Sequence, residues 1–404
     1  MAPEERRAAL IWRPPLYGKG ECTMTLARRS FLRVIGVGLA APALSRATWS
    51  QSTGGYQAAD AVAAVEPNPD FTYAPGLTPL KTALRPYRNK TYRLEKQVLS
   101  GGKFVVHNYG HGGAGITMSW GCAQEVADIV TAQFPNPAGK PVAVLGAGVM
   151  GLTAATWLTE KLRMQVTVFA KDFIPQTTSN VAGGQWAASK VAYLPGEKDK
   201  FIRILRRSHK EHGLRGNAYG VSPRENYSLV PLPAFQDVPP DLVPRTQLNR
   251  LPFTPMNQPG WKYSTLLVEP PIFLTKLQQE LQKNGVQFVY REFFDEDQVR
   301  DLAQDIIINC TGAGSDAIWR DPDLAPIKGQ LVLLPAQPRL QYLFSGSGYV
   351  FPRADCVVVG GTEETSYSDG DPDPQRCAAL VKHLKDLFDG VGPIAPPTFM
   401  IQDE

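Results

Sequence analysis

The apolar positions of this chain repeat with two different periods, and the change from one period to the other predicts alternating strands and helices. A short apolar, β-branched run at Val142–Leu145 is typical of a strand buried on both faces. Apolar residues then recur at helical spacing over Leu152–Leu162, and a second apolar run follows at Gln165–Phe169. This succession predicts a strand–helix–strand unit whose two strands are parallel.

Similar patterns continue along the chain. A strand at Lys103–Asn108 runs into a glycine-rich turn, and a helix is predicted at 115–130 directly after it. Between Pro195 and Gly260 the many prolines predict loops that form a second layer over a ligand. The other predicted elements are a helix at Phe273–Asn284 and strands at Thr82–Arg88, Tyr92–Glu95, Val286–Tyr290, Asp305–Asn309, Gln330–Leu334, Gly348–Pro352 and Val357–Gly361.

The composition narrows the class of protein. With 404 residues and 43% hydrophobic content, the chain can bury a large core, as one unit or two domains. The formal charge is only +4, and no block of Lys and Arg interleaved with aromatics suggests nucleic-acid binding. No Cys-x-x-Cys or histidine cluster has metal-ligand spacing, so no metal site is expected. Cys356 and Cys377 could pair in an oxidising compartment, which the sequence leaves open.

The first 50 residues are predicted to be an export signal that is not part of the fold. Arg28 and Arg29 precede an apolar run at Val34–Leu44, which is typical of a bacterial twin-arginine signal and too short to span a membrane. Cleavage is expected between Ala47 and Gln51, and residues 51–79 are predicted to be a linker. We therefore expect an exported protein, periplasmic or secreted, that meets the twin-arginine export machinery and whose mature form does not span the membrane.

A glycine fingerprint lies between the strand at Val142–Leu145 and the helix after it. In this context Gly146 permits a tight turn, Gly148 the close approach of a pyrophosphate, and Gly151 the packing of helix on strand. The acidic residue expected on a ribose is missing; Lys171 or Asp172 takes its place, or the two form a surface turn. The predicted dinucleotide-binding residues are Gly146, Ala147, Gly148, Val149, Met150, Gly151, Lys171 and Asp172.

A second helix N-terminus opens at the earlier glycine-rich turn. Backbone N–H groups and the helix dipole attract anions at such a terminus. Two of them side by side suit a dinucleotide that carries charge at its pyrophosphate and at its ring. The residues predicted to bind there are Gly112, Gly113, Ala114, Gly115, Ile116 and Thr117.

These two segments carry a resemblance to a known family. His107–Ala123 resembles the C-terminal signature of D-amino-acid oxidases, whereas Val142–Trp186 resembles the N-terminal part of that family. In the family the second segment comes first. The chain therefore reads as a circular permutant, in which the short, turn-rich segment 134–140 joins the two.

The resemblance implies FAD as cofactor and a D-amino-acid-oxidase-like fold: a doubly wound, Rossmann-like FAD domain of α/β type and an antiparallel β substrate domain. The permuted oxidase unit spans 80–404, with the FAD domain at about 102–190 and 265–320 and the substrate domain at about 80–101, 191–264 and 321–404. A loop rich in threonine, together with the segment after the strand at Asp305–Asn309, is implied to bind FAD as well. Its residues are Thr177, Thr178, Ser179, Gly184, Gln185 and Thr311.

The resemblance also implies a site for the substrate carboxylate. Thr82–Arg88 resembles the family segment that carries its substrate-binding arginine, which falls on Arg85. Tyr349 matches a tyrosine whose hydroxyl assists at the carboxylate, and the connection that leads to it is too short for a lid. Backbone N–H groups around Gly113 would meet negative charge that arrives on the reduced flavin. His107 and His111 are expected to hold the glycine turn by hydrogen bonds rather than to act as acid or base.

The implied reaction is oxidation of a D-amino acid to a 2-oxo acid and ammonia by hydride transfer from Cα to flavin N5. Molecular oxygen would reoxidise the flavin and give hydrogen peroxide. Two alternatives remain: a dehydrogenase or oxidase of glycine or N-methyl amino acids, and a non-catalytic flavin-binding protein of the cell envelope. Peroxide yield separates the enzymes from one another, whereas a bound flavin that no amine bleaches would favour the non-catalytic protein.

Overall fold

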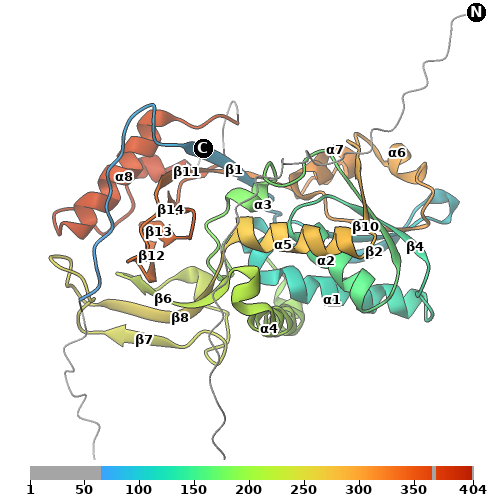
Figure 1. The fold of residues 1–404 in the computed structure, drawn as a ribbon, viewed down its shortest axis with the longest axis horizontal. Coiled ribbons are helices and arrows are strands. Elements are labelled where there is room, and N and C mark those ends of the chain that lie inside the picture. The colour runs from blue at the N-terminus through green and yellow to red at the C-terminus, as the bar shows by residue number, and fades with distance from the viewer. Residues whose placement is uncertain (1–64, 366–369, 403–404) are drawn as a thin grey trace, which may run out of the picture. The chain divides into compact units, whose positions relative to one another are not determined.

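Two β-sheets organise the part of the chain that the computed structural model describes, residues 65–365 and 370–402 (Figure 1). The predicted export signal lies outside these residues. Within them, no helix is both long and apolar enough to cross a bilayer.

The first sheet has six strands and is parallel except at one edge. Its apolar residues alternate between two cores, so both of its faces are covered. In spatial order its strands are β2 (Arg93–Val98), β3 (Phe104–Tyr109), β10 (Ile306–Asn309), β4 (Pro141–Leu145), β5 (Gln165–Ala170) and β9 (Gln287–Tyr290). The helices packed with it are α1 (Gly115–Gln133), α2 (Val149–Glu160), α5 (Pro270–Lys283), α6 (Glu296–Arg300) and α7 (Ser315–Trp319). The predicted doubly wound architecture is confirmed.

The second sheet has ten strands and is mostly antiparallel. Helix α8 (Pro374–Phe388) contributes to the core on one of its faces. Strand β1 (Leu80–Arg85) pairs with β11 (Ile327–Pro335), so segments from opposite ends of the described chain lie side by side (Figure 1). The other strands are β6 (Val221–Ser228), β7 (Arg245–Leu248), β8 (Gly260–Val268), β12 (Tyr342–Gly346), β13 (Gly348–Pro352), β14 (Cys356–Gly360), β15 (Glu363–Glu364) and β16 (Ile401–Gln402).

The prediction of loops between Pro195 and Gly260 is wrong where strands β6 and β7 form and at its start, where helix α4 (Lys198–Arg215) forms. Its buried stripe includes Phe201, Ile204, Leu205, Ser208 and His212, which have helical spacing. The many charged residues between them hide this stripe when the sequence is scanned for apolar runs. Helix α8 was not predicted either, and strand β2, assigned to the substrate domain, pairs with β3 in the six-stranded sheet.

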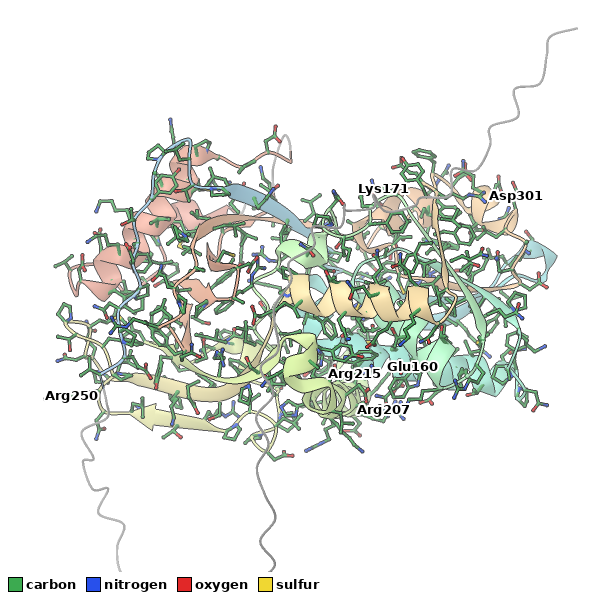
Figure 2. The ribbon with its side chains drawn as sticks, viewed as in Figure 1. Glu160, Lys171, Arg207, Arg215, Arg250 and Asp301 are labelled. Atoms are coloured by element: carbon green, nitrogen blue, oxygen red, sulfur yellow. The ribbon has the colours of Figure 1, made fainter. Side chains whose placement is uncertain are left out.

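Helix α4 packs closely against α1. A Cβ added to Gly121 of α1 would clash with the backbone carbonyl of Ile204 in α4. At the end of α4, Arg215 donates to Glu160 of α2 at 3.1 Å, and its guanidinium carbon lies 4.6 Å from the ring centre of Trp120 (Figure 2). These contacts join three helices into one layer.

The described part of the predicted linker, 65–79, lies along the second sheet without forming a strand. Phe71 is buried in the core of that sheet, 5.6 Å from Phe388 between ring centres. The hydroxyl of Tyr342 donates to the carbonyl of Pro67 at 2.7 Å. Residues 65–79 therefore pack against the second sheet and do not serve only as a linker.

Cys356 and Cys377 are free thiols in this structure. Cys356 belongs to the cluster of apolar residues that includes Phe351 and Leu343, whereas Cys377 packs in the cluster on α8. Because the two clusters occupy opposite faces of the second sheet, β-sheet backbone separates the two sulfur atoms.

Three buried histidines are held in the neutral form. The two ring nitrogens of His107 lie 3.1 Å from Asn309 Nδ2 of β10 and 2.8 Å from Gln97 Oε1 of β2, so His107 pins β3 to both neighbouring strands rather than holding the glycine turn. His111, in that turn, stacks on Tyr92, and one ring nitrogen lies 3.4 Å from the sulfur of Cys122. Burial lowers the pKa of His107 and His111 to about 3 and that of His212 to about 4.

We expect Gly121→Ala to lower the free energy of unfolding by about 1–3 kcal/mol, because the new methyl group must push α1 away from α4. The matched control is Gly213→Ala, since Gly213 lies in α4 with open space around its Cα. That change should be neutral or stabilising by up to about 1 kcal/mol. Urea denaturation of the two variants measures the difference, and equal stabilities would contradict the close packing.

The histidines also predict sensitivity to acid. An unfolded histidine has a pKa near 6.5, so below that pH the unfolded chain binds protons that the folded chain does not. Each histidine then costs about 1.4 kcal/mol of stability per pH unit as the pH falls from 6.5 toward 3 or 4. Urea denaturation at pH 7, 6 and 5 should show this slope. In His107→Gln the loss of stability per pH unit should be smaller by about 1.4 kcal/mol, the contribution of one proton. An unchanged slope would refute the assignment of His107 as neutral in the folded protein.

Candidate functional site

Two helix N-termini meet at one edge of the six-stranded sheet. Helix α1 begins at Gly115 after β3, and α2 begins at Val149 after β4, with β10 paired between these two strands. A Cβ added to Gly115 would lie 3.6 Å from Val149 Cγ1, so the two termini are in contact. Neither N-cap residue, Ala114 or Gly148, provides a side-chain cap. The arrangement leaves both helix ends suited to an anionic ligand.

The fingerprint glycines each meet backbone or a polar side chain. Gly146 has φ of +102°, and an added Cβ there would clash with the carbonyl of Cys310. A Cβ on Gly151 would clash with the carbonyl of Gly146. One on Gly148 would approach Ser179 Oγ to 3.2 Å. Gly146 therefore serves the tight turn and Gly151 the packing of helix on strand, as the sequence predicts. Gly148 faces the threonine-rich loop.

The threonine-rich loop contributes hydroxyl groups at the start of α2. Ser179 Oγ accepts a hydrogen bond from the N–H of Val149 at 3.0 Å. Thr177 Oγ1 is buried and has no partner among the described residues. The loop includes the short helix α3 (Thr178–Val181). Thr311, at the end of β10, uses its hydroxyl within the protein, at 2.8 Å from Asn309 Oδ1.

A segment that the sequence does not single out, 187–190, covers the glycine turn. A Cβ on Gly112 would clash with the carbonyl of Lys190, and one on Gly113 would lie 3.0 Å from the carbonyl of Ser189. Thr117 Oγ1 donates to the carbonyl of Ala187 at 2.8 Å and accepts from its N–H at 3.0 Å. Thr117 thus holds the covering segment. The small residues Ala187, Ala188 and Ser189 are the only sequence signal of this close approach.

Lys171 and Asp172 lie just beyond the end of β5. The ammonium group of Lys171 pairs with Glu292 at 3.3 Å, and more than half of its side chain is exposed (Figure 2). Asp172 is also exposed. The structure therefore places both at the carboxyl edge of the sheet, in a solvated position.

Arg85 and Tyr349 share one face of the second sheet. The guanidinium of Arg85 lies over Gly329, where an added Cβ would be 2.5 Å from Nη2, and its Nη1 donates to the carbonyl of Thr362 at 3.1 Å. No carboxylate of residues 65–365 or 370–402 forms an ion pair with it. Burial raises the pKa of the Tyr349 hydroxyl, and the charge of Arg85, with which it is hydrogen-bonded, partly offsets the rise.

Three glycines that the sequence analysis did not single out create the space for this pair. Gly329 lies under Arg85, and Gly360 lies under Tyr349, whose hydroxyl an added Cβ would strike. Gly183 approaches from the threonine-rich loop: a Cβ there would lie 2.5 Å from Phe351 and 3.3 Å from Tyr349 Cε2. Glycine inside a strand is the available signal, because it marks close approach of another group. Through Gly183, the loop at the helix ends reaches the face that carries Arg85.

The connection leading to Tyr349 is short, as predicted. Strands β12 and β13 pair as far as Gly346 and Gly348, so only Ser347 forms the turn. No lid can arise from this hairpin.

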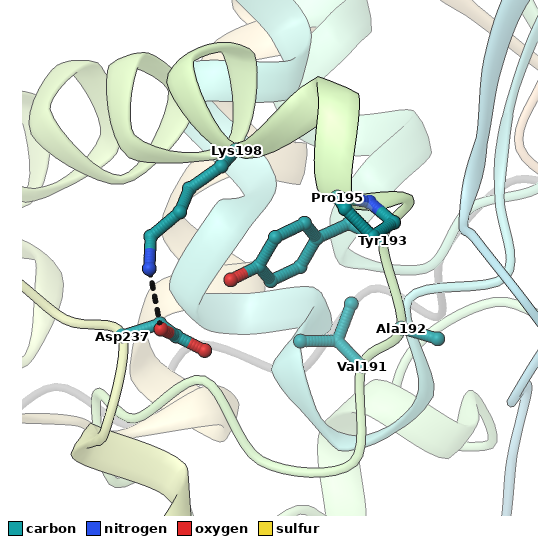
Figure 3. A pocket seen from close by; sticks show the side chains of 6 residues that line it. All are labelled: Val191, Ala192, Tyr193, Pro195, Lys198 and Asp237. Carbon is teal, nitrogen blue, oxygen red and sulfur yellow. Dashed lines mark hydrogen bonds and ion pairs between the residues drawn. The ribbon is translucent and has the colours of Figure 1, made fainter.

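A cavity of about 450 Å³ lies beyond the covering segment (Figure 3). Its charged groups pair with each other, because Lys198 lies 3.0 Å from Asp237. Burial, with Asp237 nearby, raises the pKa of Tyr193 to about 12. The lining residues are Val191, Ala192, Tyr193, Pro195, Lys198 and Asp237. Its partnered groups offer less to a ligand than the helix ends do.

Several known proteins are similar to this chain. Human D-aspartate oxidase is 27% identical over 262 residues, covering 60% of this chain and 76% of the relative. D-amino acid oxidase of Dugesia ryukyuensis is 27% identical over 268 residues, covering 62% and 78%. The crystal structure of glycine oxidase from Bacillus cereus aligns with a TM-score of 0.47 at 16% identity, covering 61% of this chain and 77% of that one.

The family model described as FAD dependent oxidoreductase (DAO) matches residues 141–400. The residues present fit FAD, because two helix N-termini whose own N-cap residues provide no side-chain cap, together with the unpartnered Thr177 hydroxyl, can bind an elongated anion that Gly148 allows to approach. The chain therefore belongs to this family of FAD-dependent oxidoreductases, and FAD is its cofactor.

Proposed function

We propose that this protein oxidises D-amino acids to 2-oxo acids, with oxygen as the electron acceptor. The observation that carries the proposal is Arg85, a guanidinium on the sheet face below Gly183 without a carboxylate partner in the described chain. A guanidinium fork binds a carboxylate through two parallel hydrogen bonds, which a substrate would supply. The relatives named as D-amino acid and D-aspartate oxidases support this substrate class.

The chain's own residues bind and orient the substrate. Arg85 fixes the carboxylate, and the Tyr349 hydroxyl, hydrogen-bonded to Arg85, is placed to donate to the same group. FAD, when bound, supplies the acceptor for the two electrons that leave the Cα–H bond. The N–H groups of residues 113–116 would hold the ring, and those at the start of α2 the pyrophosphate. Water then converts the imino acid to the 2-oxo acid and ammonia, and oxygen takes the two electrons and two protons to give peroxide.

Two other functions are the alternatives. A dehydrogenase or oxidase of glycine or N-methyl amino acids also binds a carboxylate, and it is distinguished by its substrate and by its peroxide yield. A non-catalytic flavin-binding protein would keep the helix ends but would not be bleached by any amine. The geometry around Arg85 favours an enzyme, because an unpaired, half-buried guanidinium has no structural need in a purely binding protein.

We propose further that the family's C-terminal part has moved to the front of this chain. Three observations support the permutation. The family match begins at residue 141, after the helix of the glycine turn. The similar relatives match over 76–78% of their length, which leaves a segment of each unmatched. Helix α1 ends at Gln133, and a mostly exposed connection leads to β4 at Pro141.

We also propose that the protein is exported, as a periplasmic or secreted form. The support is sequence alone: Arg28 and Arg29 ahead of Val34–Leu44. Export through the twin-arginine machinery carries folded proteins, which agrees with a protein that binds FAD before it crosses the membrane.

Arg85→Ala should retain FAD but lower kcat/KM for D-amino acids by about 30- to 1000-fold, corresponding to about 2–4 kcal/mol for a buried bidentate contact. Arg85→Lys should recover little, because an ammonium lacks the fork. Arg88→Gln is the control: Arg88 pairs with Asp321 at 2.7 Å, so its loss should lower stability and leave kcat/KM near wild type. Undiminished kcat/KM in Arg85→Ala would place the anchor elsewhere.

Restoring the family's order should leave FAD binding intact. The test is to open the chain within Asn136–Lys140 and to join Glu404 through a flexible Gly/Ser linker to Val65, so that Phe71 keeps its place in the core of the second sheet. Only surface connections change, since the strand pairings and helix contacts are the same in either order. Flavin absorbance of the purified protein reports the outcome. A rearranged protein that folds, by circular dichroism, but never binds FAD would refute the permutation.

A further inference from the structure

A cluster of polar side chains lies on the sheet face beside Tyr349. Ser345 of β12 is the direct cross-strand partner of Tyr349. Its hydroxyl donates to Asn226 Oδ1 of β6 at 2.8 Å and lies 3.4 Å from Gln185 Oε1. Gln185 follows Gly183 and Gly184, the segment that crosses over Tyr349. The cluster of Gln185, Asn226 and Ser345 therefore adjoins the carboxylate site.

Two amide nitrogens of this cluster have no partner. Asn226 is fully buried, and its Nδ2 forms no hydrogen bond with any described residue. Gln185 Nε2 is likewise buried and unpartnered. In this arrangement the Ser345 hydroxyl donates to Asn226 Oδ1, and Nδ2 is the amide atom without a partner. Buried N–H groups in native proteins are almost always satisfied, so two unsatisfied ones in one cluster indicate a ligand atom that accepts hydrogen bonds.

Arg224 adds positive charge to the same face. It lies two residues before Asn226 in β6, so the two side chains point to the same side of the sheet. Arg224 Nε is buried without a partner, and no carboxylate within the described residues forms an ion pair with this guanidinium. On the opposite side of β6, Glu225 bonds to Ser264 and does not compensate Arg224.

We infer that Gln185 and Asn226 bind the side chain of the substrate, and that this side chain carries an acceptor oxygen of a carboxylate or carboxamide. The inference rests on the proposed function. With the α-carboxylate on Arg85 and Tyr349, a short side chain directed along the sheet toward β12 and β6 meets the two free N–H groups. Gln185, expected from the sequence to bind FAD, here acts on the substrate. Arg224 favours the carboxylate, as in aspartate or glutamate.

The first experiment compares D-aspartate, D-asparagine, D-leucine and D-alanine by anaerobic bleaching of the bound flavin. D-leucine has the shape of D-asparagine without the acceptor oxygen. We expect kcat/KM for D-aspartate and D-asparagine to exceed that for D-leucine at least about 100-fold, because an apolar group would leave both donors unpaired. Equal rates for D-leucine would overturn the subsite and leave the proposed function intact. Absence of bleaching by every D-amino acid would overturn both.

The second experiment changes the cluster. Asn226→Leu should lower kcat/KM for D-aspartate and D-asparagine about ten- to a hundredfold, and for D-alanine less than about threefold. Gln185→Leu repeats the test at a less buried position, in case Asn226→Leu does not fold. Arg224→Gln should affect D-aspartate alone if the carboxylate is preferred. Ser222→Ala is the control, because it removes another unpartnered buried hydroxyl of β6 outside the cluster and should change nothing.

A binding measurement separates recognition from turnover. Succinate carries two carboxylates, whereas butyrate has a similar length and one. In the FAD-loaded protein, titration of the flavin absorbance should show succinate binding at least about tenfold tighter than butyrate, with the difference lost in Asn226→Leu. Equal affinity of the two acids in the wild-type protein would overturn the inference.

Discussion

The pairing of β10 between β3 and β4 is the constraint on which the site depends. Because all three strands are parallel, their carboxyl ends reach the same edge of the sheet, and the helices that follow β3 and β4 begin there together. The register is fixed by side chains as well as by backbone, since His107 of β3 hydrogen-bonds Asn309 of β10. Gly146 then lets the turn after β4 pass directly against Cys310. Without this pairing there would be two isolated helix ends and no shared anion site.

Much of the fold could be predicted from the sequence because its strands are short apolar runs with one period and its main helices have another. The strands at Val142–Leu145 and Asp305–Asn309 and the helix at 115–130 are found within a few residues. Helix α4 was missed because its apolar stripe is narrow and lies between charged residues that solvate the opposite face. Local patterns report what one segment buries; they do not report which distant segment covers it.

In the candidate site, too, features set by the local sequence could be predicted, whereas features set by contact with distant segments could not. Gly146 and Gly151 follow from the requirements of a tight turn next to a helix, which is local information. Gly329 and Gly360 could not be predicted, because their need arises from Arg85 and Tyr349, side chains of other strands that lie across them. The covering of the glycine turn by 187–190 is likewise a long-range contact. A resemblance to a family identifies residues such as Arg85, but the backbone space they occupy becomes visible only in three dimensions.

The face of the second sheet that carries Tyr349 also carries two positively charged side chains without ion-pair partners among the described residues. Arg85 and Arg224 bring two positive charges, and neither forms an ion pair within the described residues, although burial of an unpaired charge or amide opposes folding. Gly329 beneath Arg85 and the carbonyl of Thr362 accommodate the guanidinium without neutralising it. A protein that needed only stability would place a carboxylate there. Under the function proposed here these charges are left for a ligand, and one small molecule with two acceptor groups would pair with Arg85 and Tyr349 at one end of the face and with Asn226 at the other.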